Sequence, residues 1–98
     1  MNTVTKVSDL TYLDLQDYLR IDEIIQSDIN TLNNLMRIAK AFITKYTGVE
    51  DLDKDPDFVI VVLILVQDMW DNRTYYVDKS NLNNVVDSIL SLHSVNLL

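Results

Sequence analysis

An unbroken apolar run from Phe58 to Val66 limits what this chain can fold into more than any other feature. The run is too short for a membrane span, which needs about 20 such residues. Its Val and Ile residues favour a strand, and periodicity alone does not separate a buried strand from a buried helix in so short a run. In either form, the run has no polar face and must be covered on every side.

The residues flanking this run indicate a helix. Asp55 is a good N-cap, and Pro56 suits the first helical position, where its missing N–H would have no partner. Asp57 adds negative charge at the positive end of the helix dipole. We therefore predict a helix over residues 56–73, roughly 27 Å long. Because neighbours in a short chain cover about two faces of such a helix, we expect its third face to contact another protein chain.

Composition favours one helical domain spanning residues 1–98. The hydrophobic fraction of 48% and the charged fraction of 23% are those of an ordinary globular protein. One Gly and one Pro leave little material for the tight turns of an all-β fold. The chain has no Cys, which excludes disulfides and thiolate chemistry. Its start lacks the apolar segment of a signal peptide, so we expect the protein in the cytoplasm.

The net charge of −7 argues against two classes of partner. Binding to the phosphate backbone of nucleic acid requires concentrated Lys and Arg. Attraction to an anionic membrane surface requires the same. We therefore expect neither nucleic-acid binding nor membrane binding.

The clearest helical pattern lies in residues 28–47. Ser27 or Asp28 can cap its start, and Gly48 stands where a left-handed C-cap is expected. One apolar stripe recurs at alternating three- and four-residue steps, through Ile29, Leu32, Met36, Ala39, Ile43 and Tyr46.

Two shorter helices complete a small all-α bundle of about four helices around the central apolar one. Thr11 and Asp14 form a capping box that opens a helix over residues 11–20. Its buried side is predicted to be Leu13, Tyr18 and Leu19. Residues 1–9 are expected to be a loose leader.

The last predicted helix covers residues 81–92, and the residues after it, 93–98, are expected to be a flexible tail. Ser80 or Asn81 can cap this helix. Its apolar stripe is predicted to be Leu82, Val85, Val86, Ile89 and Leu90.

No residue pattern predicts catalysis, a cofactor or a metal site. Asp51, Asp53 and Asp55 match the first three ligand positions of a calcium loop, but the required Gly and closing Glu are Pro56 and Val62. His93 is the only His and no Cys is present, so a His or thiolate metal cluster is not expected. We interpret His93 as a surface residue near a helix C-terminus. We therefore expect a protein that is not an enzyme.

Two aromatic features leave alternatives open. Trp70 and Arg73 share a helix face, so the guanidinium can stack on the ring, or Trp70 can belong to the core with Arg73 in solvent. Tyr75 and Tyr76 can be interface anchors or loop packing.

The order of features resembles the small head–tail connector proteins of tailed bacteriophages, a DNA-packaging or head-completion family. The resemblance rests on DYLRID at residues 17–22, AKAFITKYTG at 39–48, an acidic loop with Pro56, and MWDNR at 69–73. It extends from about Leu10 to Leu92. These motifs in this order are moderately specific.

The resemblance implies a structural virion protein. About a dozen copies would form a homo-oligomeric ring under the portal protein, extend the DNA channel and dock the stopper or tail-completion protein. Double-stranded DNA would pass through without specific binding. The protein would lie at the head–tail interface of the virion, and in the host cytoplasm during assembly. The alternative is a small acidic helical adaptor or regulator that binds a basic protein partner.

Two sets of residues are candidates for these contacts. We place the subunit interface on the central helix, at Ile60, Ile64, Gln67, Trp70 and Arg73. Carboxylates that repel DNA phosphates would let DNA slide, and the candidates for an acidic channel or loop are Glu50, Asp51, Asp53 and Asp57.

Overall fold

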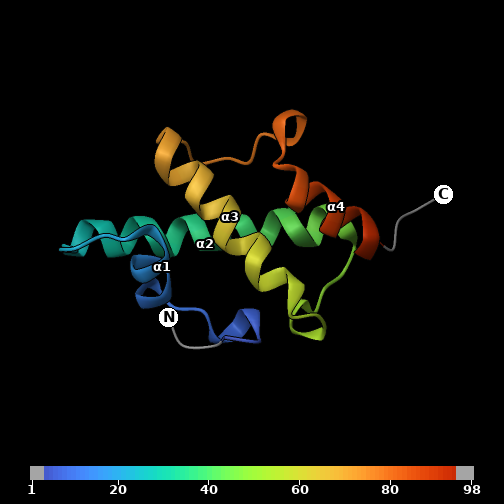
Figure 1. Cartoon of the computed structure of the whole chain (residues 1–98), viewed down its shortest axis with the longest axis horizontal. Coiled ribbons are helices and arrows are strands. Elements are labelled where there is room, and N and C mark those ends of the chain that lie inside the picture. Colours follow the sequence, from blue (N-terminus) through green and yellow to red (C-terminus); the bar gives the residue numbers. More distant parts are fainter. Residues whose placement is uncertain (1–3, 95–98) are drawn as a thin grey trace.

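Four α-helices form the bundle in the computed structural model, which describes residues 4–94 (Figure 1). They are α1 (Tyr12–Leu19), α2 (Gln26–Thr47), α3 (Asp57–Asn72) and α4 (Asn84–His93). Single turns of 3-10 helix, η1 to η3, lie at Val7–Asp9, Leu52–Lys54 and Lys79–Asn81. No strand occurs in the described part of the chain. The prediction of a small all-α bundle is confirmed.

Helix α3 lies at the centre of the fold. It crosses in front of the long helix α2 in Figure 1 and packs against α1, α2, α4 and η1. These neighbours bury Met69 and most of the apolar run, namely Phe58, Val59, Val61, Val62, Leu63, Leu65 and Val66. The chain therefore covers its central helix more completely than the sequence predicted, because the N-terminal segment adds a further neighbour. A stripe of α3 that includes Ile60, Asp68 and Asp71 stays open, and Asn72 is exposed at the end of the helix.

The start of α3 has the predicted chemistry. The Oδ1 atom of Asp55 accepts the backbone N–H of Asp57 at 2.9 Å. Pro56 has helical dihedral angles, φ −64° and ψ −19°. At the start of a helix the first backbone N–H groups have no partner within the helix. Pro56 has no N–H, and Asp55 accepts the N–H of Asp57, so both residues favour a helix for the β-branched run that follows.

Helix α2 ends as predicted and begins two residues earlier than predicted. Gly48 has φ 78°, and its N–H donates to the carbonyl of Thr44 at 2.8 Å, which confirms the left-handed C-cap. The helix begins at Gln26. Asp28 lies inside its first turn, where the carboxylate accepts the N–H of Ile25 at 3.4 Å. Asp28 is therefore a first-turn acceptor and not the N-cap.

The N-terminal segment is packed where the sequence suggested a loose leader. From Val4 to Asp9 the described chain lies against the bundle, and Val7 is 3% exposed. Residues 1–3 lie outside the described residues. The apolar side chains at positions 7 and 10 fill the gap beside α3 and the 3-10 turn Leu52–Lys54. This burial explains why the segment is ordered.

The buried side of α1 differs from the predicted one. The capping box is present, with the N–H of Thr11 donating to Asp14 at 2.9 Å. Leu15, however, is the fully buried residue, and Leu13 is 59% exposed. The prediction that Leu13 is buried was wrong, because Leu15 lies one turn from Leu19 and faces α2 and α3 with it.

Helix α4 begins later than predicted. Asn83 is its cap, and the side-chain Oδ1 accepts the N–H of Val85 at 2.8 Å. Residues 79–81 form a separate 3-10 turn capped by Asp78. Val86 and Leu90 are buried, whereas Val85 is 52% exposed. Residues 95–98 of the expected tail lie outside the described residues.

Replacing Arg20 by glycine is expected to raise the free energy of unfolding by about 0.5–1 kcal/mol. Arg20 ends α1 with φ 58° and ψ 46°, a left-handed conformation that glycine adopts without a Cβ clash. Urea unfolding followed by circular dichroism measures the change. Arg20→Ala is the control, because alanine keeps the Cβ atom; an equal gain in that variant would contradict the explanation.

Candidate functional site

The open stripe of α3 is the first candidate interaction surface. Its residues recur at helical spacing, each three or four positions from another member: Asp57, Ile60, Ile64, Gln67, Asp68 and Asp71. Ile60 is 38% exposed and Ile64 is half-buried. The side-chain oxygen of Gln67 accepts the Tyr18 hydroxyl at 3.3 Å, which links α3 to α1. Ile60, Ile64 and Gln67, three of the predicted interface residues, therefore share one surface with a short apolar centre and acidic edges.

Trp70 and Arg73 lie on a different side of α3. The guanidinium of Arg73 stands 4.7 Å from the centre of the Trp70 ring, so the predicted stacking is present. The half-buried ring lines a small crevice with Thr31 and Leu35 of α2 and with Tyr75. The structure therefore separates these two residues from Ile60 and Ile64, and the predicted interface set divides into two surfaces.

The acidic loop before α3 is stabilised by its own carboxylates. Asp53 accepts two hydrogen bonds from Ser8, from the N–H at 2.9 Å and from the hydroxyl at 2.6 Å. Asp51 accepts the N–H of Asp53 at 3.1 Å. Of the predicted acidic residues, Asp51, Asp53 and Asp57 thus have partners within the chain, and Glu50 is exposed.

Replacing Ser8 by alanine is expected to raise the pKa of Asp53. The hydrogen bonds from Ser8 hold this pKa below its ordinary value of 3.8. A carboxyl group whose pKa is lowered by folding stabilises the folded state at pH values above its ordinary pKa. This stabilisation is lost as the pH falls through the lowered pKa. The stability difference between wild type and Ser8→Ala should therefore be largest near neutral pH and shrink below about pH 4.

Carboxyl NMR titration measures the pKa of Asp53 in both proteins. Asp78 is an internal control, because its pKa is lowered by Asn81 and Ser80 and should not respond to the change at position 8. An unchanged pKa at Asp53 would contradict the predicted role of Ser8.

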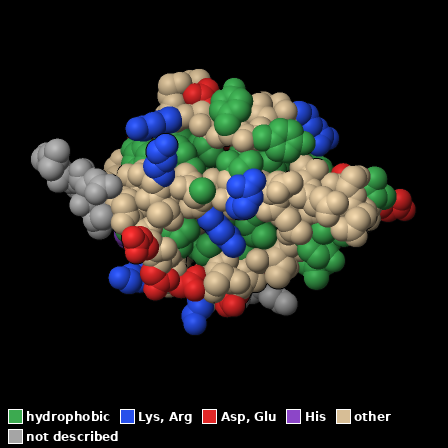
Figure 2. Space-filling model, turned by 180° about the vertical axis from the view of Figure 1, so that it is seen from behind, with side chains coloured by type: hydrophobic (Ala, Val, Ile, Leu, Met, Phe, Trp, Pro, Cys, Tyr) green, Lys and Arg blue, Asp and Glu red, His purple; other side chains and the backbone are tan. Residues whose placement is uncertain are grey.

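The outer face of α2 is a second surface, which net charge alone did not reveal. Residues 29–49 contain no Asp or Glu, although the whole chain has a net charge of −7. Arg37 and Lys45 are exposed on this face, and Lys40 is partly exposed beside them. Figure 2 shows this side of the molecule, with Lys and Arg side chains across its middle and acidic side chains gathered near its lower edge. The absence of Asp and Glu from residues 29–49 is the sequence feature that indicates this basic face.

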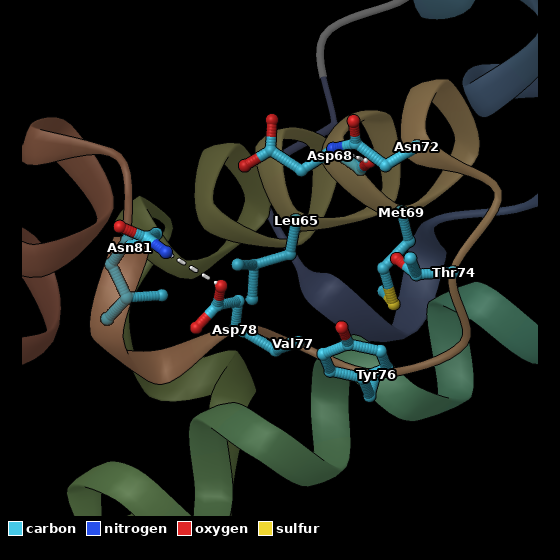
Figure 3. A pocket seen from close by; sticks show the side chains of 10 residues that line it. Leu65, Asp68, Met69, Asn72, Thr74, Tyr76, Val77, Asp78 and Asn81 are labelled. Atoms are coloured by element: carbon cyan, nitrogen blue, oxygen red, sulfur yellow. Dashed lines mark hydrogen bonds between the residues drawn. The ribbon is translucent and has the colours of Figure 1, made fainter.

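A cleft of about 460 Å³ separates the end of α3 from the segment that leads to α4 (Figure 3). Leu65 and Met69 supply apolar lining, and Asp68 and Asp78 lie toward different parts of its rim. Burial, and then the neighbouring Asp71, raise the pKa of Asp68. The other lining residues are Asn72, Thr74, Tyr76, Val77, Asn81 and Leu82. This arrangement can receive an apolar side chain that carries a donor or a positive charge.

His93 is not the isolated surface residue that its sequence position suggested. Its ring contacts Phe58 edge-on, with ring centres 5.2 Å apart, and its side chain is 23% exposed. The Nε2 atom lies 3.1 Å from Oδ2 of Asp55 and 3.5 Å from Oδ2 of Asp57. The structure therefore joins the end of α4 to the start of α3 through polar side chains.

Comparisons with protein-family models, curated proteins and solved structures find no match to this chain. Within residues 4–94, none of the helices combines the length and the hydropathy that crossing a membrane requires. The candidate surfaces therefore rest on the geometry of this chain alone.

Proposed function

We propose that the protein is a structural adaptor that acts without catalysis, as a subunit of the ring that connects the head and tail of a bacteriophage. The observation that carries the proposal is a pair of unlike surfaces on opposite sides of the α2–α3 layer. One is the stripe of α3 around Ile60 and Ile64, which has acidic edges. The other is the acid-free outer face of α2.

Two unlike surfaces suit a ring better than a two-fold dimer. A two-fold dimer uses the same patch on both subunits, whereas a ring needs a different patch on each side of the subunit. Asp68 and Asp71 on α3 are complementary in charge to Arg37 and Lys45 on α2. Complementary charges favour the correct register and disfavour contact between two acidic faces.

The small size of the open apolar centre supports assembly on a platform. Ile60 and Ile64 are its only apolar members, and the chain buries most other apolar side chains of α3. Stable interfaces bury about 1,600 Å² in total. The contact between two subunits with so short an apolar stripe is weak in solution. Binding to a portal that aligns many copies raises their effective concentration and so stabilises the contact. The ring would then extend the DNA channel and dock the stopper or tail-completion protein.

Free acidic groups support passage of DNA without binding. Asp53 and Asp57 have partners within the chain, so the exposed Glu50 is the most available of the predicted loop carboxylates. A channel lined with negative charge repels phosphates and lets DNA slide.

The second candidate function is an adaptor that binds a basic protein. The cleft beside the end of α3 favours it, because Asp68 and Asp78 lie around an apolar floor. A Lys or Arg side chain of a partner could bury its aliphatic stem on Leu65 and Met69 and pair with a rim carboxylate.

The deciding experiment is affinity capture of the full chain from host lysate with phage functions induced, followed by mass spectrometry and electron microscopy of the captured complex. Recovery of a portal protein bearing a ring of this chain is the expected result. Recovery of one small basic protein without virion components would replace the ring proposal with the adaptor.

A further inference from the structure

Three side chains of types that bind metal ions lie together where the end of α4 contacts the start of α3. The atoms offered by Asp55, Asp57 and His93 all lie within 4.8 Å of one another. His93 follows Asp57 by 36 positions and Asp55 by 38 positions in the sequence, so the cluster depends on the packing of α4 against α3. Its members are one imidazole nitrogen and two carboxylate oxygens.

The Nε2 atom of His93 is not satisfied by the groups around it. It has less than 1 Å² of exposed surface and no hydrogen-bond partner among the described residues. The carboxylates of Asp55 and Asp57 lie close enough for attraction to a charged imidazole, yet neither contact has the geometry of a hydrogen bond. A buried nitrogen that faces two carboxylate oxygens without a hydrogen bond is able to bind a cation together with them.

The two distances from Nε2 of His93 are close to the spacing between neighbouring ligands of one metal ion. Zinc binds imidazole nitrogen and carboxylate oxygen at about 2.0–2.2 Å, which places neighbouring ligands of a tetrahedral site about 3.4 Å apart. The two observed distances from Nε2, 3.1 Å and 3.5 Å, lie on either side of this value.

The local structure holds two of the ligands in place. Asp55 uses Oδ1 to accept the N–H of Asp57, which leaves Oδ2 directed at His93. The edge-on contact with Phe58, which is 1% exposed, fixes the plane of the imidazole. Ligands that are already oriented lose less conformational freedom when a metal binds.

We propose that Asp55, Asp57 and His93 bind one zinc ion. The imidazole ligand favours zinc over calcium or magnesium, which prefer oxygen ligands. Two carboxylates balance the double positive charge of the ion, and the 57% exposed side chain of Asp57 leaves room for water at the remaining position. The ion fixes the end of α4 to the start of α3.

Isothermal titration of the untagged full chain with zinc chloride, and separately with magnesium chloride, tests the proposal. We expect one zinc ion per chain and much weaker binding of magnesium. His93→Gln and Asp57→Asn should each weaken zinc binding by about tenfold or more. Glu50→Gln is the matched control, because it removes one exposed negative charge from the same loop, and its affinity for zinc should equal that of the wild type.

The imidazole gives a direct second readout, since His93 is the only His in the chain. Its NMR resonances should shift on addition of one equivalent of zinc, with the shift lost in Asp57→Asn. That variant keeps the shape of the exposed side chain and is therefore expected to fold normally. The absence of any shift, or zinc affinities that are equal in all four proteins, would overturn the proposal.

Discussion

Replacing Leu15 by alanine is expected to lower the free energy of unfolding by about 2–5 kcal/mol, whereas Leu13→Ala should change it by less than about 0.5 kcal/mol. The two leucines are two residues apart on the same short helix. Leu15 is 0% exposed in the core between α1, α2 and α3, and Leu13 is 59% exposed. A cavity at position 15 removes contacts that the neighbours cannot restore by relaxing.

Urea unfolding of both variants, followed by far-ultraviolet circular dichroism, measures the difference. Each variant is the control for the other, because the residue type, the helix and the helix propensity are the same. Equal destabilisation of the two proteins would mean that α1 packs in a different rotation about its axis.

The same helix shows where sequence reasoning reaches its limit. Over two turns, apolar residues at positions 12, 13, 15, 18 and 19 satisfy more than one choice of buried face. The choice is made by the surfaces that α1 meets, and those belong to α2 and α3. The long helix α2 was predictable because its apolar stripe repeats over about five turns, so any other rotation of the helix would bury Asn and Lys side chains.

The central helix was predicted from its boundaries and not from its interior. Val59 to Val62 are β-branched and favour a strand, yet Asp55 and Pro56 start a helix. How much of α3 is buried was not predictable from the sequence, because this burial depends on the segment around Val7, which packs beside α3. An apolar run indicates that its side chains are buried, but it does not indicate which part of the chain covers them.

The candidate sites also contain a part that the sequence predicts and a part that depends on how the helices pack. Ile60, Ile64 and Gln67 share a stripe because helical spacing puts them there, which sequence alone predicts. The position of Trp70 outside that stripe follows from the same helical spacing. The contact of His93 with Asp55 depends on how α4 crosses α3, and no pattern within either helix carries that information.

Replacing Ile60 by aspartate is expected to weaken ring assembly by about 100-fold or more while the free energy of unfolding changes by less than about 1 kcal/mol. Ile60 is 38% exposed at the middle of the α3 stripe. In an interface, the new carboxylate would replace the apolar centre of the stripe and add to the like charges of Asp57 and Asp68 beside it. In the free subunit, the carboxylate can turn into solvent.

Assembly on purified portal protein, quantified by native mass spectrometry, measures this effect. Val85→Asp is the matched control, because Val85 is a 52% exposed β-branched residue on α4, away from the stripe. Chemical unfolding of both variants separates loss of an interface from loss of the fold. Normal rings formed by Ile60→Asp would exclude the α3 stripe as the subunit contact and direct attention to the surface around Trp70 and Arg73. Failure of both variants to assemble despite normal stability would mean that α4 also belongs to the interface, since a charge on a free surface has no physical reason to block a ring.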